Sequence, residues 1–105
     1  MGWLLLLLRD GPSYGYELRR ELHVRTFELD RAVMYRSLRE MERDDLIASQ
    51  WTNSETGPKR RVYSLTAAGS AELDRIAGEI RAAREGHEAF LTTYERPSLT
   101  ARGGG

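Results

Sequence analysis

The sequence contains no cysteine among its 105 residues. This absence excludes disulfide bonds, thiolate zinc sites and cysteine nucleophiles together. It is also typical of proteins that work in the reducing cytoplasm, which is the compartment we expect for this chain. The two histidines, His23 and His87, have no carboxylate or histidine neighbour at metal-ligand spacing, so we predict neither a metal site nor a cofactor.

The chain also lacks a hydrophobic run long enough to cross a membrane. Its densest apolar stretch extends from Trp3 to Leu8, whereas a membrane-spanning helix needs about 20 apolar residues. Arg9 and Asp10 follow at once, which distinguishes the stretch from the longer apolar segment of a signal peptide. We therefore expect a short, enclosed helix over residues 3–9 and no membrane partner.

Net charge is missing as well, because 16 basic and 16 acidic side chains cancel to a formal charge of zero. Non-specific coating of nucleic acid depends on neutralising many phosphates, so this balance argues against that class of protein. It leaves open a specific nucleic-acid binder whose positive charge is local. The sequence has no credible catalytic serine triad and no glycine-rich phosphate loop, so we do not expect an enzyme.

Two further helices are expected after the first one. Gly11-Pro12 ends the first helix, and Ser13 is a suitable N-cap for a second helix that runs to about Leu22. Asp30 is a suitable N-cap for a third helix, which runs to about Asp44. The third helix has apolar residues on one side and arginines on the other, as expected for a helix that packs on its own domain. Its apolar stripe comprises either Val33 or Met34, then Leu38 and Met41.

A β-hairpin is expected after the third helix. Residues 48–52 and 60–65 have the composition of strands, and residues 53–58 between them are rich in turn formers. The order helix, helix, helix, hairpin predicts a winged helix-turn-helix DNA-binding domain over residues 1–65. The expected fold class is therefore mainly α (α+β), with a two-stranded β wing.

A long last helix is expected over residues 66–96, before Pro97. Apolar and small residues recur in it at alternating spacings of four and three, which is typical of a helix that packs against another helix. Nothing in the first 65 residues is large enough to cover this stripe, so we predict a C-terminal dimerisation helix and a homodimer. Residues 97–105 are interpreted as a disordered tail. The stripe comprises Gly69, Leu73, Ile76, Ile80, Ala83, His87, Phe90 and Tyr94.

Two clusters of basic residues carry the functional prediction. The outer face of the third helix has the positive and polar side chains that a recognition helix needs to reach base edges. The hairpin has cations near its tip, which suit the minor groove or the flanking phosphates. A plainer interpretation is that helix arginines pair with Glu40, Glu42 and Asp44, and that hairpin cations guard a sheet edge. The candidate DNA contacts are Arg31, Tyr35, Arg36 and Arg39 on the helix, and Lys59, Arg60, Arg61 and Tyr63 on the hairpin.

Three motifs occur in a recognisable order along the chain. They are LLLLLRDGPSYGYEL at residues 4–18, MYRSL with ERDDLI over residues 34–47, and GPKRRVYSLT at residues 57–66 with Gly69. Together they resemble the PadR family of transcriptional regulators over about residues 4–80. The resemblance implies a winged helix domain with one C-terminal dimerisation helix, the short subtype of the family. It also implies that Tyr35 and Arg36 face DNA, that Arg60 and Arg61 lie on the wing, and that Tyr63 lies in the strand below it.

The function that this resemblance implies is sequence-specific DNA binding by a transcriptional regulator. We expect a homodimeric repressor that recognises a palindromic operator in double-stranded DNA and is released by a small-molecule or stress signal. The alternative is a winged-helix module that binds other proteins without contacting DNA. One departure from the family concerns Asp45, which stands where relatives often have glycine, so we expect strain in that turn.

An effector site is a further implication of the resemblance. The ligand would be a small aromatic or drug-like molecule held between the subunits of the dimer. Ile80 stands where some drug-binding relatives have a tryptophan, so this chain lacks one surface on which a flat ligand stacks. The candidate residues, for which a plain dimer core is the simpler explanation, are Trp3, Leu7, Ile76, Ile80, Ala83, His87 and Phe90.

Overall fold

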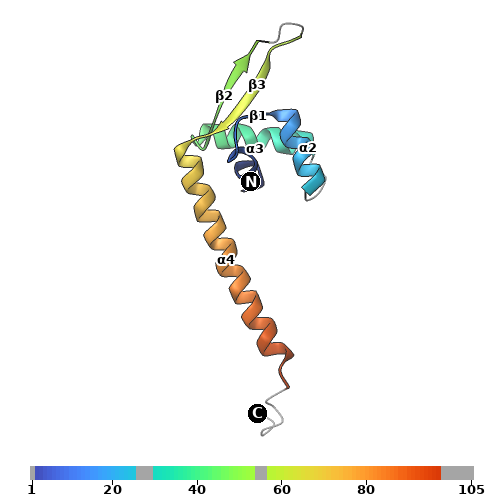
Figure 1. Ribbon diagram of the computed structural model, residues 1–105, viewed down its shortest axis with the longest axis vertical. Helices are drawn as coiled ribbons and strands as arrows, with labels where there is room; N and C mark the ends of the chain where they lie inside the picture. The colour runs from blue at the N-terminus through green and yellow to red at the C-terminus, as the bar shows by residue number, and fades with distance from the viewer. Residues whose placement is uncertain (1, 26–29, 54–56, 98–105) are drawn as a thin grey trace. The chain divides into compact units, whose positions relative to one another are not determined.

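A computed structural model of the protein describes residues 2–25, 30–53 and 57–97. The chain divides into two units, Met1–Asp74 and Arg75–Gly105. The described residues form a mainly helical structure with one small antiparallel sheet, which confirms the predicted winged helix fold. In chain order, and as labelled in Figure 1, the elements are α1 (Gly2–Leu8), β1 (Ser13–Tyr14), α2 (Gly15–Arg25), α3 (Arg31–Arg43), β2 (Ile47–Thr52), β3 (Arg60–Leu65) and α4 (Ala67–Glu95).

The sheet of the first unit has three strands in the order β1-β3-β2, one more than the sequence predicts. β2 and β3 form the expected hairpin, in which Trp51 lies opposite Arg61. Residues 54–56, at the centre of the predicted turn, lie outside the described residues. The additional strand, β1, pairs with the other edge of β3, where Ser13 lies opposite Tyr63. A strand of two residues is too short to show the alternation by which strands are recognised in a sequence.

The start of α2 also differs from the prediction, because Ser13 belongs to β1 and does not cap the helix as an acceptor. The Glu17 carboxylate accepts hydrogen bonds from the Tyr14 backbone N–H at 2.9 Å and from the Ser13 hydroxyl at 3.3 Å. A carboxylate in the first helical turn thus satisfies the N–H of the residue before the helix, which is one half of a capping box. The helix begins at Gly15, two residues later than its expected cap.

The start of α3 agrees with the prediction. Asp30 is its N-cap, and the carboxylate accepts a hydrogen bond from the Ala32 backbone N–H at 2.7 Å. Of the two candidates for the apolar stripe, Met34 is fully buried, whereas Val33 is 36% exposed. The buried side of α3 therefore consists of Met34, Leu38 and Met41, and the arginines of this helix are exposed to solvent.

The end of α3 is closed by a Schellman motif. The Leu46 N–H donates to the Met41 carbonyl at 2.9 Å, and the Asp45 N–H donates to the Glu42 carbonyl at 3.0 Å. Asp45 has a φ of 61°, in the left-handed region that glycine adopts at least cost. The strain expected at this aspartate is thus visible in the backbone of the turn between α3 and β2.

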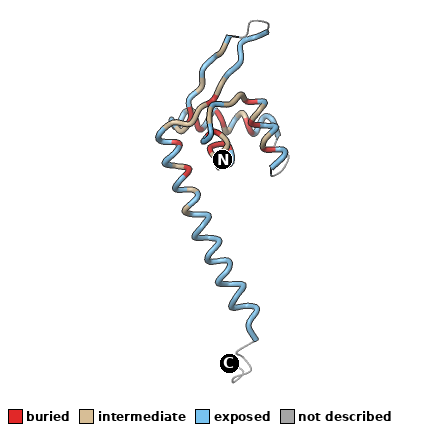
Figure 2. Tube along the Cα trace, viewed as in Figure 1, coloured by how far each residue is buried: buried red, intermediate tan, exposed pale blue. Residues whose placement is uncertain are grey.

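The hydrophobic core of the first unit lies among α1, α2, α3 and the base of the hairpin, where Figure 2 shows the buried residues in red. Helix α1 is only partly enclosed: Leu4, Leu5 and Leu8 are buried, but Trp3 is 37% exposed. A helix of seven residues has a single face toward the core, so its all-apolar composition does not bury every side. The largest fully buried side chains are Leu4, Leu5, Leu8, Leu18, Leu22, Met34, Leu38 and Ile47.

Hydrogen bonds link the start of α4 to the turn that follows α3. The Thr66 hydroxyl donates to the Asp45 carbonyl at 2.6 Å and accepts from the Gly69 backbone N–H at 2.9 Å. Gly69 is buried, and a Cβ at this position would overlap the carbonyl oxygen of Leu46. One threonine and one glycine thus hold the first turn of α4 against the rest of the first unit.

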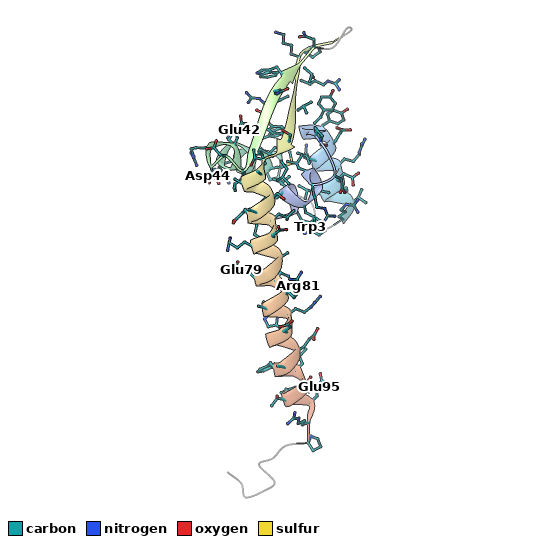
Figure 3. All side chains as sticks on the ribbon, turned by 60° about the vertical axis from the view of Figure 1, so that its left-hand side comes forward. Trp3, Glu42, Asp44, Glu79, Arg81 and Glu95 are labelled. Atoms are coloured by element: carbon teal, nitrogen blue, oxygen red, sulfur yellow. The ribbon has the colours of Figure 1, made fainter. Side chains whose placement is uncertain are left out.

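The second unit consists of the remainder of α4 and the residues that follow it, of which residues 75–97 are described. Every residue from Glu79 to Pro97 is exposed in the single chain, and Figure 3 shows the side chains from Glu79 to Glu95 projecting from the helix. Ile80 is 63% and Phe90 is 68% exposed. No helix of the described residues is long and apolar enough to cross a membrane.

Candidate nucleic-acid interface

An open groove on the first unit brings together β1, α2, α3 and the hairpin. We call it the cationic groove, because four of its residues carry a positive charge. Six of the eight predicted DNA-contacting residues line it, and they come from segments almost 30 residues apart in the sequence. The residues of the cationic groove are Tyr14, Gly15, Tyr16, Arg31, Tyr35, Trp51, Lys59, Arg60, Arg61 and Tyr63.

The two remaining predicted contacts, Arg36 and Arg39, are exposed on α3 and do not line the groove. Consecutive residues of a helix are about 100° apart around its axis, so Arg36 points well away from the direction of Tyr35. Both arginines extend the positive face of α3 beyond the edge of the groove. The structure therefore divides the predicted contacts into a groove set and a helix-surface set.

The plainer interpretation of the helix arginines, as partners of nearby acids, is not what the structure has. Glu42 instead accepts hydrogen bonds from the Ser49 hydroxyl on β2, at 2.9 Å to each carboxylate oxygen. Within the described part of the chain, Arg31, Arg36 and Arg39 form no ion pair with an acidic side chain. Their positive charges are therefore available to an external anion.

Three arginines of the described part of the first unit lie over aromatic rings. A guanidinium within about 6 Å of a ring centre is attracted by the negative face of the ring. Such a pair restrains the arginine without neutralising its charge. Measured from the guanidinium carbon to the ring centre, the pairs are Arg61 over Trp51 at 4.8 Å, Arg60 over Tyr16 at 5.4 Å and Arg31 over Tyr35 at 5.7 Å.

Strand pairing accounts for the position of two of these rings. Trp51 and Arg61 lie directly opposite each other on β2 and β3, and residues in that relation project from the same face of a sheet. Tyr14 is held in β1 opposite Val62, and its ring stacks on that of Tyr16 at 5.7 Å between ring centres. The short strand β1 thus brings the start of α2 to the wing.

Tyr63 has a different environment from the other residues of the groove. It is only 6% exposed, so it forms part of the floor of the groove and not of its rim. Burial raises the pKa of its hydroxyl above the usual value of 10.0, and the positive charge of Arg61 opposes this shift. The hydroxyl consequently stays neutral, as a hydrogen-bonding group, throughout the physiological pH range.

Sequence reasoning missed three aromatic residues of the groove: Tyr14, Tyr16 and Trp51. A signal for Trp51 was present, because a hairpin centred on the predicted turn pairs residue 51 with residue 60 or 61. Tyr16 gives no such signal, since its neighbour Arg60 is 44 residues away in the sequence and no pattern joins them.

The candidate effector residues are divided between the two units. Trp3 and Leu7 lie on α1, where they line a groove formed with α2 in the first unit. The other five effector candidates lie on α4 in the second unit; they are Ile76, Ile80, Ala83, His87 and Phe90.

Among the residues that the structure describes, no cluster of three or more His, Asp or Glu side chains could hold a metal ion.

Known proteins are similar to this chain in sequence and in fold. An uncharacterised protein of Lysinibacillus sphaericus is 27% identical over 95 residues, which span 88% of this chain and 87% of that protein. A crystal structure of a PadR family transcription regulator from Clostridium difficile R20291 is similar at a TM-score of 0.80 and 30% identity, covering 86% of this chain and 95% of that one.

A second solved structure contains DNA. Bacillus subtilis PadR in complex with operator DNA is similar at a TM-score of 0.66 and 23% identity, over 72% of this chain and 45% of that one, a likeness that establishes the fold alone. The family description that matches this chain is that of the transcriptional regulator PadR-like family, over residues 4–75. Because the matched region is well over half of the sequence, the chain belongs to the transcriptional regulator PadR-like family.

Proposed function

We propose that this chain is a sequence-specific DNA-binding transcriptional regulator. The observation that carries the proposal is the cationic groove, in which positive residues of α3 and of the wing line one surface without acidic partners among the described residues. The structure of Bacillus subtilis PadR with operator DNA supports it, because a protein of the same fold binds DNA there. We propose DNA rather than a protein as the partner because the exposed arginine and lysine side chains can donate hydrogen bonds to phosphates and base edges.

In this proposal α3 lies in the major groove. Arg36 and Arg39 reach base edges, since a guanidinium makes a bidentate pair with guanine that contributes about 1–3 kcal/mol of discrimination. Arg31 and Tyr35 bind at the border between base edges and backbone. The wing cations Lys59, Arg60 and Arg61 bind flanking phosphates, and Tyr63 supports them from the floor of the groove.

We further propose that the regulator is a homodimer held together by α4. The second unit leaves Ile80, Phe90 and Tyr94 largely exposed in the single chain. Removing such apolar surface from water contributes about 25 cal/mol per Å² in favour of association, from which the entropic cost of bringing two chains together is subtracted. A twofold dimer recognises a near-palindrome, whose half-sites lie about one helical turn, roughly 10 base pairs, or a multiple of it apart.

The dimer is tested by its mass in solution. Phe90→Glu places a charge in the apolar stripe, so we expect sedimentation equilibrium to give twice the chain mass for the wild type and a shift toward the single chain for the variant. Arg84→Glu, off the stripe on the same helix, is the matched control and is expected to leave the dimer intact. A wild type that sediments as a single chain would contradict the proposal.

We also propose that the protein is a repressor released by a small aromatic effector or a stress signal. An effector acts only if it prefers a dimer whose recognition helices are wrongly spaced, because equal affinity for both states shifts nothing. The residues that we propose for the effector site are Trp3 and Leu7 of α1 and Ile76, Ile80, Ala83, His87 and Phe90 of α4. In a Trp51→Phe variant, Trp3 is the single tryptophan, so its fluorescence reports on that region alone. No saturable quenching by planar aromatic compounds would count against a pocket there.

DNA binding is tested by selection from a pool of random duplexes. We expect enrichment of a near-palindromic sequence, and we expect Arg36→Ala or Arg39→Ala to relax the preference at particular base pairs. Arg84→Ala removes an exposed arginine of the second unit and is expected to leave the selected sequence unchanged. If no sequence is enriched by the wild type, the protein-binding alternative replaces this proposal.

A further inference from the structure

An arginine on an exposed hairpin can adopt many rotamers. Binding a phosphate selects one of them, and the lost freedom subtracts from the affinity. A protein that holds the side chain in the binding orientation beforehand avoids part of this loss. Any residue that restrains the wing cations before DNA binds would therefore increase the affinity for DNA.

Two exposed aromatic rings lie where such a restraint is needed. Trp51 is 61% and Tyr16 is 50% exposed, so burial in the core does not explain their positions. The Trp51 ring lies 4.8 Å from the guanidinium carbon of Arg61, and the Tyr16 ring lies 5.4 Å from that of Arg60. Each adjacent wing arginine thus has its own ring, one from β2 and one from α2.

A contact with a ring does not occupy all the N–H donors of an arginine. A guanidinium carries five N–H donors that point outward in its plane. An arginine held near a ring, and in the case of Arg61 also hydrogen-bonded to Tyr63, therefore keeps donors for a further partner. The donors match the oxygens of a phosphate, to which they can bind in pairs. Among the described residues neither Arg60 nor Arg61 forms an ion pair with an acid that would occupy these donors.

The rings are themselves fixed by the fold. Trp51 is the cross-strand neighbour of Arg61, so the ladder between β2 and β3 sets their spacing. Tyr16 stacks on Tyr14 with an interplanar angle of 8°, and Tyr14 is paired with Val62 of β3. Backbone pairing therefore sets the position of Trp51 directly, and that of Tyr16 through its stacking on Tyr14.

We infer that Trp51 and Tyr16 are positioning residues for DNA binding: their rings hold Arg61 and Arg60 with the guanidinium edges ready for backbone phosphates. The inference rests on the proposed DNA-binding function and adds two residues to it. The ligand group is the phosphodiester of duplex DNA. The rings act through the arginines and make no contact with bases.

The test is a double-mutant cycle on the Trp51 pair. The probe is the fluorescein-labelled duplex that the wild type selects from the random pool, and binding is followed by anisotropy. Trp51→Ala is expected to weaken binding roughly two- to fivefold, the range of an exposed cation–ring contact, and Trp51→Phe to restore most of the loss. In an Arg61→Ala background, Trp51→Ala is expected to have no further effect.

Tyr16 provides a second, independent cycle. Tyr16→Phe keeps the ring and removes the hydroxyl, so it is expected to bind like the wild type. Tyr16→Ala is expected to weaken binding roughly two- to fivefold, less than Arg60→Ala does, and to have no further effect in an Arg60→Ala background. Gln50→Ala, an exposed residue of β2 that belongs to neither pair, is the matched control and is expected to change nothing. Thermal unfolding of each variant checks that the domain is folded, and the Tyr16 cycle stands alone if Trp51→Ala does not fold.

Two results would overturn the inference. The first is an additive loss, in which removing a ring weakens binding equally with and without its arginine, since the ring would then contact DNA directly. The second is a Trp51→Ala and a Tyr16→Ala variant that bind as tightly as the wild type. Either outcome leaves wild-type binding and the proposed function intact, whereas a wild type that binds no duplex removes both.

Discussion

The ring of Tyr35 lies directly against the backbone of Gly15. A Cβ at residue 15 would stand 2.5 Å from the Tyr35 hydroxyl oxygen and 2.9 Å from its ring. The contact joins the first turn of α2 to the side of α3 that lines the cationic groove, and Arg31 lies over the same ring. A glycine on α2 thereby determines where an arginine–tyrosine pair of α3 stands.

Gly15→Ala is expected to displace Tyr35 without unfolding the domain. The added methyl group meets the outer end of a side chain that can move into the open groove, and alanine favours helix over glycine by about 1 kcal/mol. We expect the free energy of unfolding to change by less than about 1 kcal/mol and the affinity for the selected duplex to fall about fivefold, the value of one lost hydrogen bond. Tyr35→Ala is the reference: unchanged affinity in Gly15→Ala alongside a loss in Tyr35→Ala would refute this coupling.

Gly69→Ala is expected to destabilise the first unit. The new Cβ would overlap the Leu46 carbonyl, which is backbone and is also bonded to the Thr66 N–H at 3.2 Å, so it cannot move aside cheaply. Overpacking of this kind lowers the free energy of unfolding by about 1–3 kcal/mol. Gly78→Ala is the matched control, because nothing lies within 4 Å of its added Cβ, and helix propensity should raise stability by up to about 1 kcal/mol. Urea unfolding that ranks the two variants in the opposite order would contradict this account.

Asp45→Gly is expected to stabilise the protein. Asp45 adopts a φ of 61°, a conformation that costs a non-glycine residue about 1–2 kcal/mol. Glycine relieves that cost but gains freedom in the unfolded chain, so we expect a net increase of about 0.5–1 kcal/mol in the free energy of unfolding. Asp45→Ala should instead destabilise. The prediction fails if both variants unfold at lower urea concentration than the wild type.

The buried hydroxyl of Tyr63 predicts a loss of stability in alkali. Its folded-state pKa is raised above 10.0 by burial, so above that pH the unfolded chain releases a proton that the folded chain retains. Stability from this residue is therefore complete below pH 10.0 and decreases as the pH rises toward the folded-state pKa. Between about pH 9 and 11, the wild type should lose stability relative to Tyr63→Phe. A difference between the two that does not vary with pH would rule this out.

Local chemistry made much of the fold predictable. Asp30 caps α3 because a carboxylate before an apolar stripe satisfies the free N–H groups of a helix start, and Asp45 is left-handed because the chain must turn there. These effects involve neighbouring residues only. Strand β1 was not predictable, because Ser13 and Tyr14 become a strand only by pairing with β3, about 50 residues later.

The candidate site also has a part that the sequence predicts and a part that it does not. Charge marks Arg60 and Arg61 in the sequence, and their presence in one groove with Arg31 follows from the winged helix fold. The rings of Trp51 and Tyr16 depend on hairpin register and on the placement of α2, which the sequence does not display. Composition thus predicts which residues bear charge, whereas tertiary structure determines which rings hold them.

The most direct test of the account uses the absence of cysteine, which makes an introduced cysteine the unique attachment point for a DNA-cleaving iron chelate. Asn53 is exposed and directly follows the last residue of β2, so Asn53→Cys places the chelate on the wing. With the selected duplex, we predict two clusters of cuts, symmetric about its centre and flanking the half-sites. The cysteine-free parent, treated in the same way, should give none. Specific binding by the labelled protein with cuts spread evenly along the duplex would show that the wing does not face DNA.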